Sequence, residues 1–109
     1  MNIEEIREYA LAKPNTEEGM PFGNDTLVFK VNGKIFLLMG LDAQPLQFNV
    51  KCDPDRAVEL REQHTSIIPG YHMNKKHWNS VIVDGSLTNK ELKEQIDHSY
   101  SLVAPKKKK

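Results

Sequence analysis

The stretch TLVFKVNGKIFLLMGL, from Thr26 to Leu41, decides the fold. Two runs rich in β-branched and aromatic residues flank the pair Asn32-Gly33. An Asn-Gly pair favours a two-residue type I′ turn, because both central positions of that turn need positive φ. The stretch therefore predicts a β-hairpin in which Val31 faces Lys34.

The two faces of this hairpin differ in character. A regular register places apolar residues opposite one another beyond the tip: Phe29 faces Phe36, and Leu27 faces Leu38. The opposite face carries Val28, Lys30, Ile35 and Leu37. We therefore expect one sheet face to be core and the other to be at least partly exposed to water.

Signals on both sides of the hairpin add a helix, a loop and a third strand. Asn2 and Glu5 form a capping box that starts an N-terminal helix. Residues 15–25, with two glycines and a proline, are expected to form a loop. Residues 46–51 alternate as a half-buried strand does, with Leu46, Phe48 and Val50 directed inward.

The C-terminal half repeats the combination of helices and strands. Asp53-Pro54 is a good helix start, with an acidic N-cap before proline at the first helical position. Residues 71–73 and 78–83 are expected to form strands, and the capping box of Thr88 and Glu91 starts a final helix. The predicted fold is α+β with two layers, in the order α-β-β-β-α-β-β-α. Its antiparallel sheet has the helices on one face.

Length and composition limit the kinds of protein that this chain can be. At 109 residues the chain forms one domain, which we place at residues 1–105, followed by a disordered lysine tail at 106–109. A single cysteine allows no internal disulfide, and no apolar run is long enough to span a membrane. The N-terminal MNIEEIREY is acidic, unlike a signal peptide. We expect a cytoplasmic monomer without a membrane partner.

Charge is balanced overall but uneven along the chain. The formal net charge is zero, and without the four terminal lysines the chain has 11 basic and 15 acidic residues. Apart from the lysine tail, the basic excess lies in residues 30–76, with seven bases against five acids. A strongly DNA-binding domain usually has a clear basic excess on one face. This charge distribution argues against a large basic surface, but it allows a small basic patch.

The segment PGYHMNKKHWNSV, residues 69–81, has the densest set of functional groups. A hairpin turn centred on Asn74-Lys75 would place His72 opposite His77, as a metal pair requires. A turn centred on Lys75-Lys76 would instead pair Met73 with Trp78 and Asn74 with His77. Zinc would need at least one or two further ligands, and nothing local brings the only thiol near. We expect no metal site and no cofactor.

Covalent catalysis is poorly supported. Cys52 lies at a predicted helix start, which can lower the pKa of a thiol, but Asp53 and Asp55 act in the opposite direction. The serines lie in no nucleophile elbow, and the glycines are isolated rather than gathered in a phosphate-binding loop. A non-enzymatic protein is the better interpretation.

Anion binding fits the same segment better. Lys75 and Lys76 lie on or near a turn, with Asn74, His77 and Trp78 beside them. Cationic donors next to a stacking ring can hold a phosphate backbone and a base. Lys30 and Lys51 are directed outward from the predicted sheet.

Three segments carry a resemblance to a known family: NVKCDPDRAVELREQH at 49–64, PGYHMNKKHWNSVIVDG at 69–85 and IDHSYSLV at 96–103. They are similar to the MmcQ/YjbR family of small bacterial proteins, as is the hairpin VFKVNGKIF. The resemblance implies a compact α+β domain like the secretion chaperone-like and CyaY-like folds. It also implies DNA binding, by analogy with a double-wing DNA-binding domain, and no catalytic chemistry.

The favoured hypothesis is a DNA-binding module with its contact surface on the hairpin tip and the outer sheet face. The expected contacts are Lys75, Lys76, Lys51 and Lys30 for phosphates, Asn74, His72 and His77 as hydrogen-bond donors, and Trp78 for stacking. An alternative is a protein-interaction or chaperone-like module that docks a partner on Val28, Ile35 and Leu37. A third is an enzyme or ligand-binding protein with a pocket around His72, His77 and Cys52.

Overall fold

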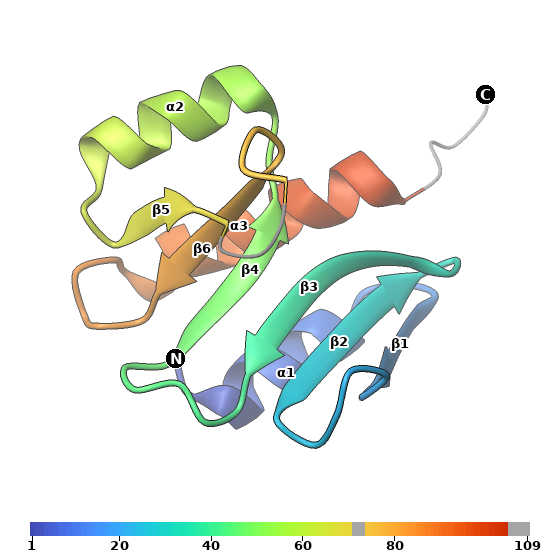
Figure 1. Cartoon of the computed structure of the whole chain (residues 1–109). Coiled ribbons are helices and arrows are strands. Elements are labelled where there is room, and N and C mark those ends of the chain that lie inside the picture. The colour runs from blue at the N-terminus through green and yellow to red at the C-terminus, as the bar shows by residue number, and fades with distance from the viewer. Residues whose placement is uncertain (71–73, 105–109) are drawn as a thin grey trace, which may run out of the picture.

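A computed structural model describes residues 1–70 and 74–104 of the chain (Figure 1). The elements are α1 (Ile3–Leu11), β1 (Thr16–Gly19), β2 (Thr26–Val31), β3 (Lys34–Gly40), β4 (Gln47–Lys51), α2 (Pro54–Gln63), β5 (Ile67–Pro69), β6 (Trp78–Ile82) and α3 (Asn89–Val103). The strands form one sheet in the order β1-β2-β3-β4-β6-β5, and every pairing is antiparallel.

Helices α1 and α3 pack on one face of this sheet, as was predicted for all the helices. Figure 1 shows α1 and α3 behind the strands, and α2 contacts β5 at the end of the sheet. The core between the layers includes Ile6 of α1, Ile96 of α3 and the fully buried Phe29, Phe36 and Phe48. Burying a side chain of this size contributes about 1.5–3 kcal/mol, so the three rings are major sources of stability. None of the described helices is long and apolar enough to cross a bilayer.

Helix starts are built as their local sequences predict. Asn2 and Thr88 each close a complete capping box, with Glu5 and Glu91 respectively. Asp53 accepts from the first backbone N–H groups of α2, with proline at the first helical positions. A capping residue of this kind contributes about 1 kcal/mol, which helps to fix each boundary.

The central hairpin has the predicted turn, but its register changes beyond the tip. Asn32 and Gly33 have φ values of 50° and 81°, and Val31 faces Lys34. A bulge then shifts the pairing, so Phe29 faces Leu37 rather than Phe36. The predicted pairs Phe29–Phe36 and Leu27–Leu38 are therefore wrong. With the extra residue, both Phe36 and Leu37 can be fully buried, and Leu37 lies in the core instead of on the outer face.

Ser99 of α3 forms hydrogen bonds with two backbone groups beside the bulge that lie beyond the end of the β3–β4 ladder. The β3–β4 ladder ends at Leu37–Val50. Beyond it, the Ser99 hydroxyl accepts from the Lys51 N–H at 2.9 Å and donates to the Phe36 carbonyl at 2.5 Å. A side chain of the final helix thus joins two strands at this point.

One strand lies where a loop was predicted, so the element order is α-β-β-β-β-α-β-β-α rather than the predicted one. Residues 16–19 pair with β2, although TEEG has no apolar alternation. Two interactions outside the segment hold it: the ladder to β2 and a bidentate ion pair from Arg7 of α1 to Glu18. Tertiary pairing here overrides a weak local preference for strand.

The second hairpin also differs from prediction. The strand β5 lies at Ile67–Pro69, with Ile67 opposite Val81 and Pro69 opposite Asn79. This register matches neither predicted turn position, and the strand predicted at 71–73 lies outside the described residues. Gly70 is needed where the two strands meet, because a Cβ on it would lie 2.8 Å from the Cβ of Trp78.

Candidate nucleic-acid interface

One end of the sheet brings most of the predicted contact residues together. Strands β2 and β4 end there, and β3 and β6 begin there, because neighbouring strands run in opposite directions. We call this the basic end and define it by Lys51, Asn74, Lys75, Lys76, His77 and Trp78. Lys51 and Trp78 face each other across β4 and β6.

The side chains of Lys51 and Trp78 lie on the helix-free face. Phe48 and Val50 of β4 and Val81 of β6 point into the core, so the alternate positions point outward. Both side chains are half-buried, which leaves part of each accessible. An aromatic ring and an ammonium group are therefore neighbours on an outer surface.

The tip itself is a compact turn with exposed lysines. The Asn74 side chain accepts from the Lys76 N–H at 3.0 Å, and its carbonyl accepts from the N–H groups of His77 and Trp78. The His77 carbonyl in turn accepts from the Cys52 N–H at 2.7 Å. With its backbone hydrogen-bonded in this way, the turn presents Asn74, Lys75 and Lys76 to solvent.

Arg61 of α2 fixes this turn from the helix side. Its Nε donates to the Asn79 side chain at 2.8 Å, and one terminal nitrogen donates to the carbonyls of Lys75 at 2.5 Å and Trp78 at 3.1 Å. The planar guanidinium can serve several acceptors at once, which a lysine ammonium does less rigidly. Sequence reasoning missed this role. The available signal was the spacing from the buried Ala57, four residues earlier on the same helix face.

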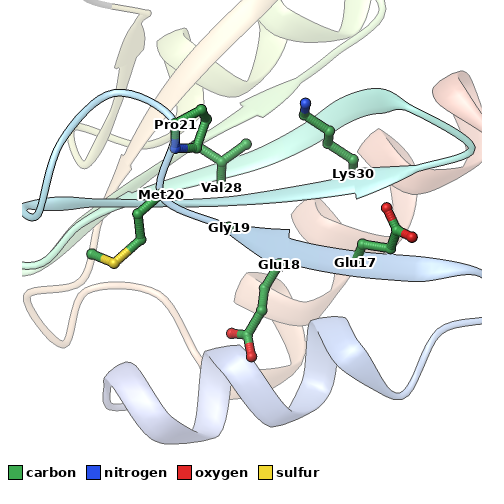
Figure 2. A pocket seen from close by; sticks show the side chains of 7 residues that line it. All are labelled: Glu17, Glu18, Gly19, Met20, Pro21, Val28 and Lys30. Carbon is green, nitrogen blue, oxygen red and sulfur yellow. The ribbon is translucent and has the colours of Figure 1, made fainter.

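Two predicted contacts are less clearly part of this group. His72 lies outside the described residues. Lys30 is on the same outer face, but two strands away from β4, which is on the order of 10 Å. It faces Glu17 of β1 (Figure 2), whose negative charge opposes phosphate binding at that position.

The Cys52 thiol does not have the properties of a nucleophile. It is 1% exposed, and its pKa is raised, mainly by burial. Nearby His98 has a lowered pKa, first because of burial and second because of Arg56, and its Nε2 accepts from the Asp53 N–H at 3.2 Å. A protonated thiol and an engaged neutral imidazole serve packing rather than catalysis. Within residues 1–70 and 74–104, no three His, Cys, Asp or Glu side chains gather as metal ligands would.

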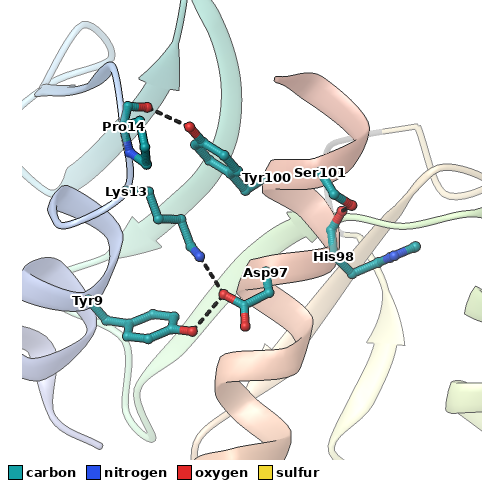
Figure 3. A network of polar contacts seen from close by, with 7 residues as sticks. All are labelled: Tyr9, Lys13, Pro14, Asp97, His98, Tyr100 and Ser101. Atoms are coloured by element: carbon teal, nitrogen blue, oxygen red, sulfur yellow. Dashed lines mark hydrogen bonds and ion pairs between the residues drawn. The ribbon is translucent and has the colours of Figure 1, made fainter. Parts of the chain in front are cut away.

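A second polar group joins α1 to α3 on the helix side (Figure 3). The Tyr9 hydroxyl donates to Asp97 at 2.6 Å, and Lys13 forms an ion pair with the same carboxylate. The Lys13 ammonium lies 4.8 Å from the Tyr9 ring centroid and 5.3 Å from that of Tyr100. Burial, and then the bond to Asp97, raise the pKa of Tyr9 to about 12. The phenol therefore stays protonated at neutral pH, and the group acts as a clasp between helices.

The predicted apolar docking face is also altered. Leu37 belongs to the core, and the outer position is taken by Leu38, which faces Val28. Val28 is 1% and Leu38 9% exposed. The outer face near β2 and β3 therefore offers little accessible apolar surface.

Comparisons with known proteins agree on one family. The YjbR family model matches residues 11–102. Among relatives, the uncharacterized protein YbdF of Escherichia coli O157:H7 is 41% identical, over 92% of this chain and 82% of its own length. The uncharacterized protein YjbR of E. coli K12 is 32% identical, over 92% of this chain and 85% of its own.

Solved structures give the same fold. The crystal structure of Deinococcus radiodurans protein DR2400, a DUF419 domain, matches with a TM-score of 0.89 and 39% identity, covering 94% of this chain and 78% of that one. A crystal structure from Pseudomonas syringae matches with a TM-score of 0.81 and 30% identity, covering 94% and 99%.

Proposed function

The chain belongs to the YjbR family, and from this premise we propose that it is a non-enzymatic module that binds DNA through its basic end. Lys51, Lys75 and Lys76 neutralise phosphates, Asn74 and His77 donate hydrogen bonds, and Trp78 stacks on an accessible base or sugar. The observation that carries the proposal is the pair Lys51–Trp78 on the helix-free face, beside an exposed Lys75-Lys76 turn.

The state of the lysines supports this assignment. Among the described residues, Lys51, Lys75 and Lys76 form no ion pair with an acidic side chain. A lysine with no protein partner can bind phosphate without first breaking an internal salt bridge. Counterion release from the nucleic acid then favours binding at low salt.

The rigidity of the tip also supports the proposal. Arg61 and the Asn74 turn hold the backbone of residues 74–78, so a bound phosphate would order little besides the two lysine side chains. Less ordering on binding means a smaller entropic cost. Lys30 stays a predicted contact at the margin of this surface, and His72, outside the described residues, stays a predicted contact. Similarity to the double-wing, secretion chaperone-like and CyaY-like folds also stays a prediction.

Salt-dependent affinity tests the proposal. Fluorescence anisotropy with a labelled DNA duplex and the matching single strand should give an affinity that falls linearly with salt on logarithmic axes. For the duplex, removing two phosphate contacts in Lys75→Ala/Lys76→Ala should lower the slope by about 1.8. The matched control is Lys90→Ala/Lys93→Ala, which removes the same charge from α3, near the opposite end of the sheet.

Two outcomes would overturn the proposal. Absence of binding to either DNA at low salt would remove the function itself. An equal change of slope in the two double variants would show that binding depends on net charge rather than on the basic end. The alternative, a protein-interaction module on the outer apolar face, is weakened by the burial of Val28 and Leu38.

A further inference from the structure

A pocket of about 400 Å³ opens over β1 and β2 at one edge of the sheet, and β3 lies between these strands and β4 (Figure 2). Its volume lies within the range of sites that bind small molecules. Its lining consists of Glu17, Glu18, Gly19, Met20, Pro21, Val28 and Lys30.

The pocket exists because position 19 has no side chain. Gly19 faces Val28 across β1 and β2, so a Cβ on it would point to the outer face, where Val28 points. The nearest atom to such a Cβ is Cδ of Pro21, at 4.0 Å. The φ of Gly19 is not in the left-handed region. A larger residue would therefore fill the pocket without backbone strain.

The lining combines an apolar part with two charges of opposite sign. Figure 2 shows Val28 and Pro21 on the same side of the sheet as Lys30, with Glu17 opposite Lys30 on the neighbouring strand. Within the described part of the chain, neither Glu17 nor Lys30 forms a hydrogen bond or ion pair through its side chain. The adjacent Glu18, by contrast, is fully engaged by Arg7. The pocket thus holds one available carboxylate and one available ammonium group.

We propose that this pocket binds a free α-amino acid with an apolar side chain. The ligand carboxylate pairs with Lys30, its ammonium group pairs with Glu17, and its side chain packs mainly against the exposed Pro21, above the almost fully buried Val28. A ligand with a single charge would meet a like charge: an anion would face Glu17, and a cation would face Lys30. The terminal residue of a longer peptide carries only one of the two charged groups, so the free amino acid is the better match.

This site is separate from the proposed DNA surface, apart from Lys30. The pocket-filling variant Gly19→Val removes no charge, and a β-branched residue suits a strand. It should leave DNA binding unchanged while it blocks the pocket. Failure of one proposal is therefore distinguishable from failure of the other.

The experiment is an NMR titration of the full chain with L-phenylalanine and, separately, L-methionine. We expect saturable amide shifts at Val28, Lys30 and Gly19, and loss of those shifts in a folded Gly19→Val protein. Removing one charge pair, by Lys30→Gln or Glu17→Gln, should weaken binding about tenfold, which corresponds to a charged hydrogen bond. Lys34→Gln is the matched control, because Lys34 belongs to the same hairpin but does not line the pocket.

Ligand analogues test the requirement for both charges. N-acetyl-L-phenylalanine lacks the ammonium group and L-phenylalaninamide lacks the carboxylate, so both should bind at least about tenfold more weakly than L-phenylalanine. The proposal is overturned by the absence of saturable shifts with either amino acid. Equal binding by Gly19→Val overturns it too, as does equal binding of the analogues. Should Gly19→Val not fold, the two charge variants and the analogues give the same decision.

Discussion

Replacing Ser99 with alanine tests how the final helix is joined to the sheet. The Ser99 hydroxyl is fully buried and serves two backbone groups beyond the end of the β3–β4 ladder: the Lys51 N–H and the Phe36 carbonyl. Alanine fits the same space and suits a helix, so the change removes the hydrogen bonds and little else.

The cost follows from the two groups left unpaired. A buried backbone group without a partner costs about 1–3 kcal/mol. The Phe36 carbonyl is buried, and the Lys51 N–H is partly buried and can recover part of its loss from water. We therefore expect Ser99→Ala to lower the free energy of unfolding by about 2–3 kcal/mol.

Ser101→Ala is the matched control, on the same helix and with the same atoms removed. The Ser101 hydroxyl donates only to the His98 carbonyl, in an exposed position (Figure 3). Its loss should change stability by at most about 0.5 kcal/mol. Urea unfolding, with equal dependence on denaturant in both variants, measures the difference. If Ser99→Ala were as stable as Ser101→Ala, the proposed link between α3 and the bulge would be refuted.

Three further predictions concern the basic end and its support. Gly70→Ala should destabilise the protein by about 1–3 kcal/mol in urea unfolding, because its Cβ would lie 2.8 Å from that of Trp78; a stability equal to wild type would contradict this. Arg61→Lys keeps the charge but removes the fork, so hydrogen exchange at the Trp78 amide should accelerate about tenfold, and unchanged exchange would refute the role of the clamp. The pKa of His98 is lowered in the folded protein from its ordinary 6.5, so the stability that depends on neutral His98 is complete above about pH 6.5 and is lost as the pH falls through the folded value. His98→Gln should flatten this acid-side loss in unfolding experiments at a series of pH values, whereas parallel curves for the two proteins would contradict the assignment.

Local signals predicted much of the fold. The Asn32-Gly33 turn and the three N-caps are each determined by four or five consecutive residues, so each forms much as the sequence indicates. The alternation of residues 46–51 likewise placed Phe48 and Val50 in the core. These features depend on backbone conformation and short-range hydrogen bonds, which neighbouring residues largely determine.

The features of the fold that the sequence did not predict depend on contacts between distant segments. The strand β1 forms only because β2 and Arg7 hold it, and the bulge at Phe36 depends on Ser99 of a distant helix. At the end of β5, the observed approach to Trp78 leaves no room for a Cβ at Gly70. None of these partners is close in sequence to the segment that it orders.

The candidate site shows the same division between local features, which the sequence predicts, and long-range contacts, which it does not. The exposed lysines of the tip could be predicted because a polar turn between strands is almost always on the surface. The clamp by Arg61 could not, since it joins residues 14 and 17 positions apart across two elements. The pocket beside Gly19 was equally hidden, because an absent side chain matters only once the neighbouring strand and Pro21 are in place.

Mapping of the DNA contact by NMR tests the central claim most directly. A short duplex, added at low salt to the isotope-labelled chain, should shift the amides of Lys51, Lys75, Lys76 and His77 and the indole N–H of Trp78. These shifts should disappear as salt is raised, because they depend on phosphate contacts. Shifts confined to α1 or the first turns of α3, or no shifts at low salt, would contradict the assignment of the basic end as a DNA-binding surface.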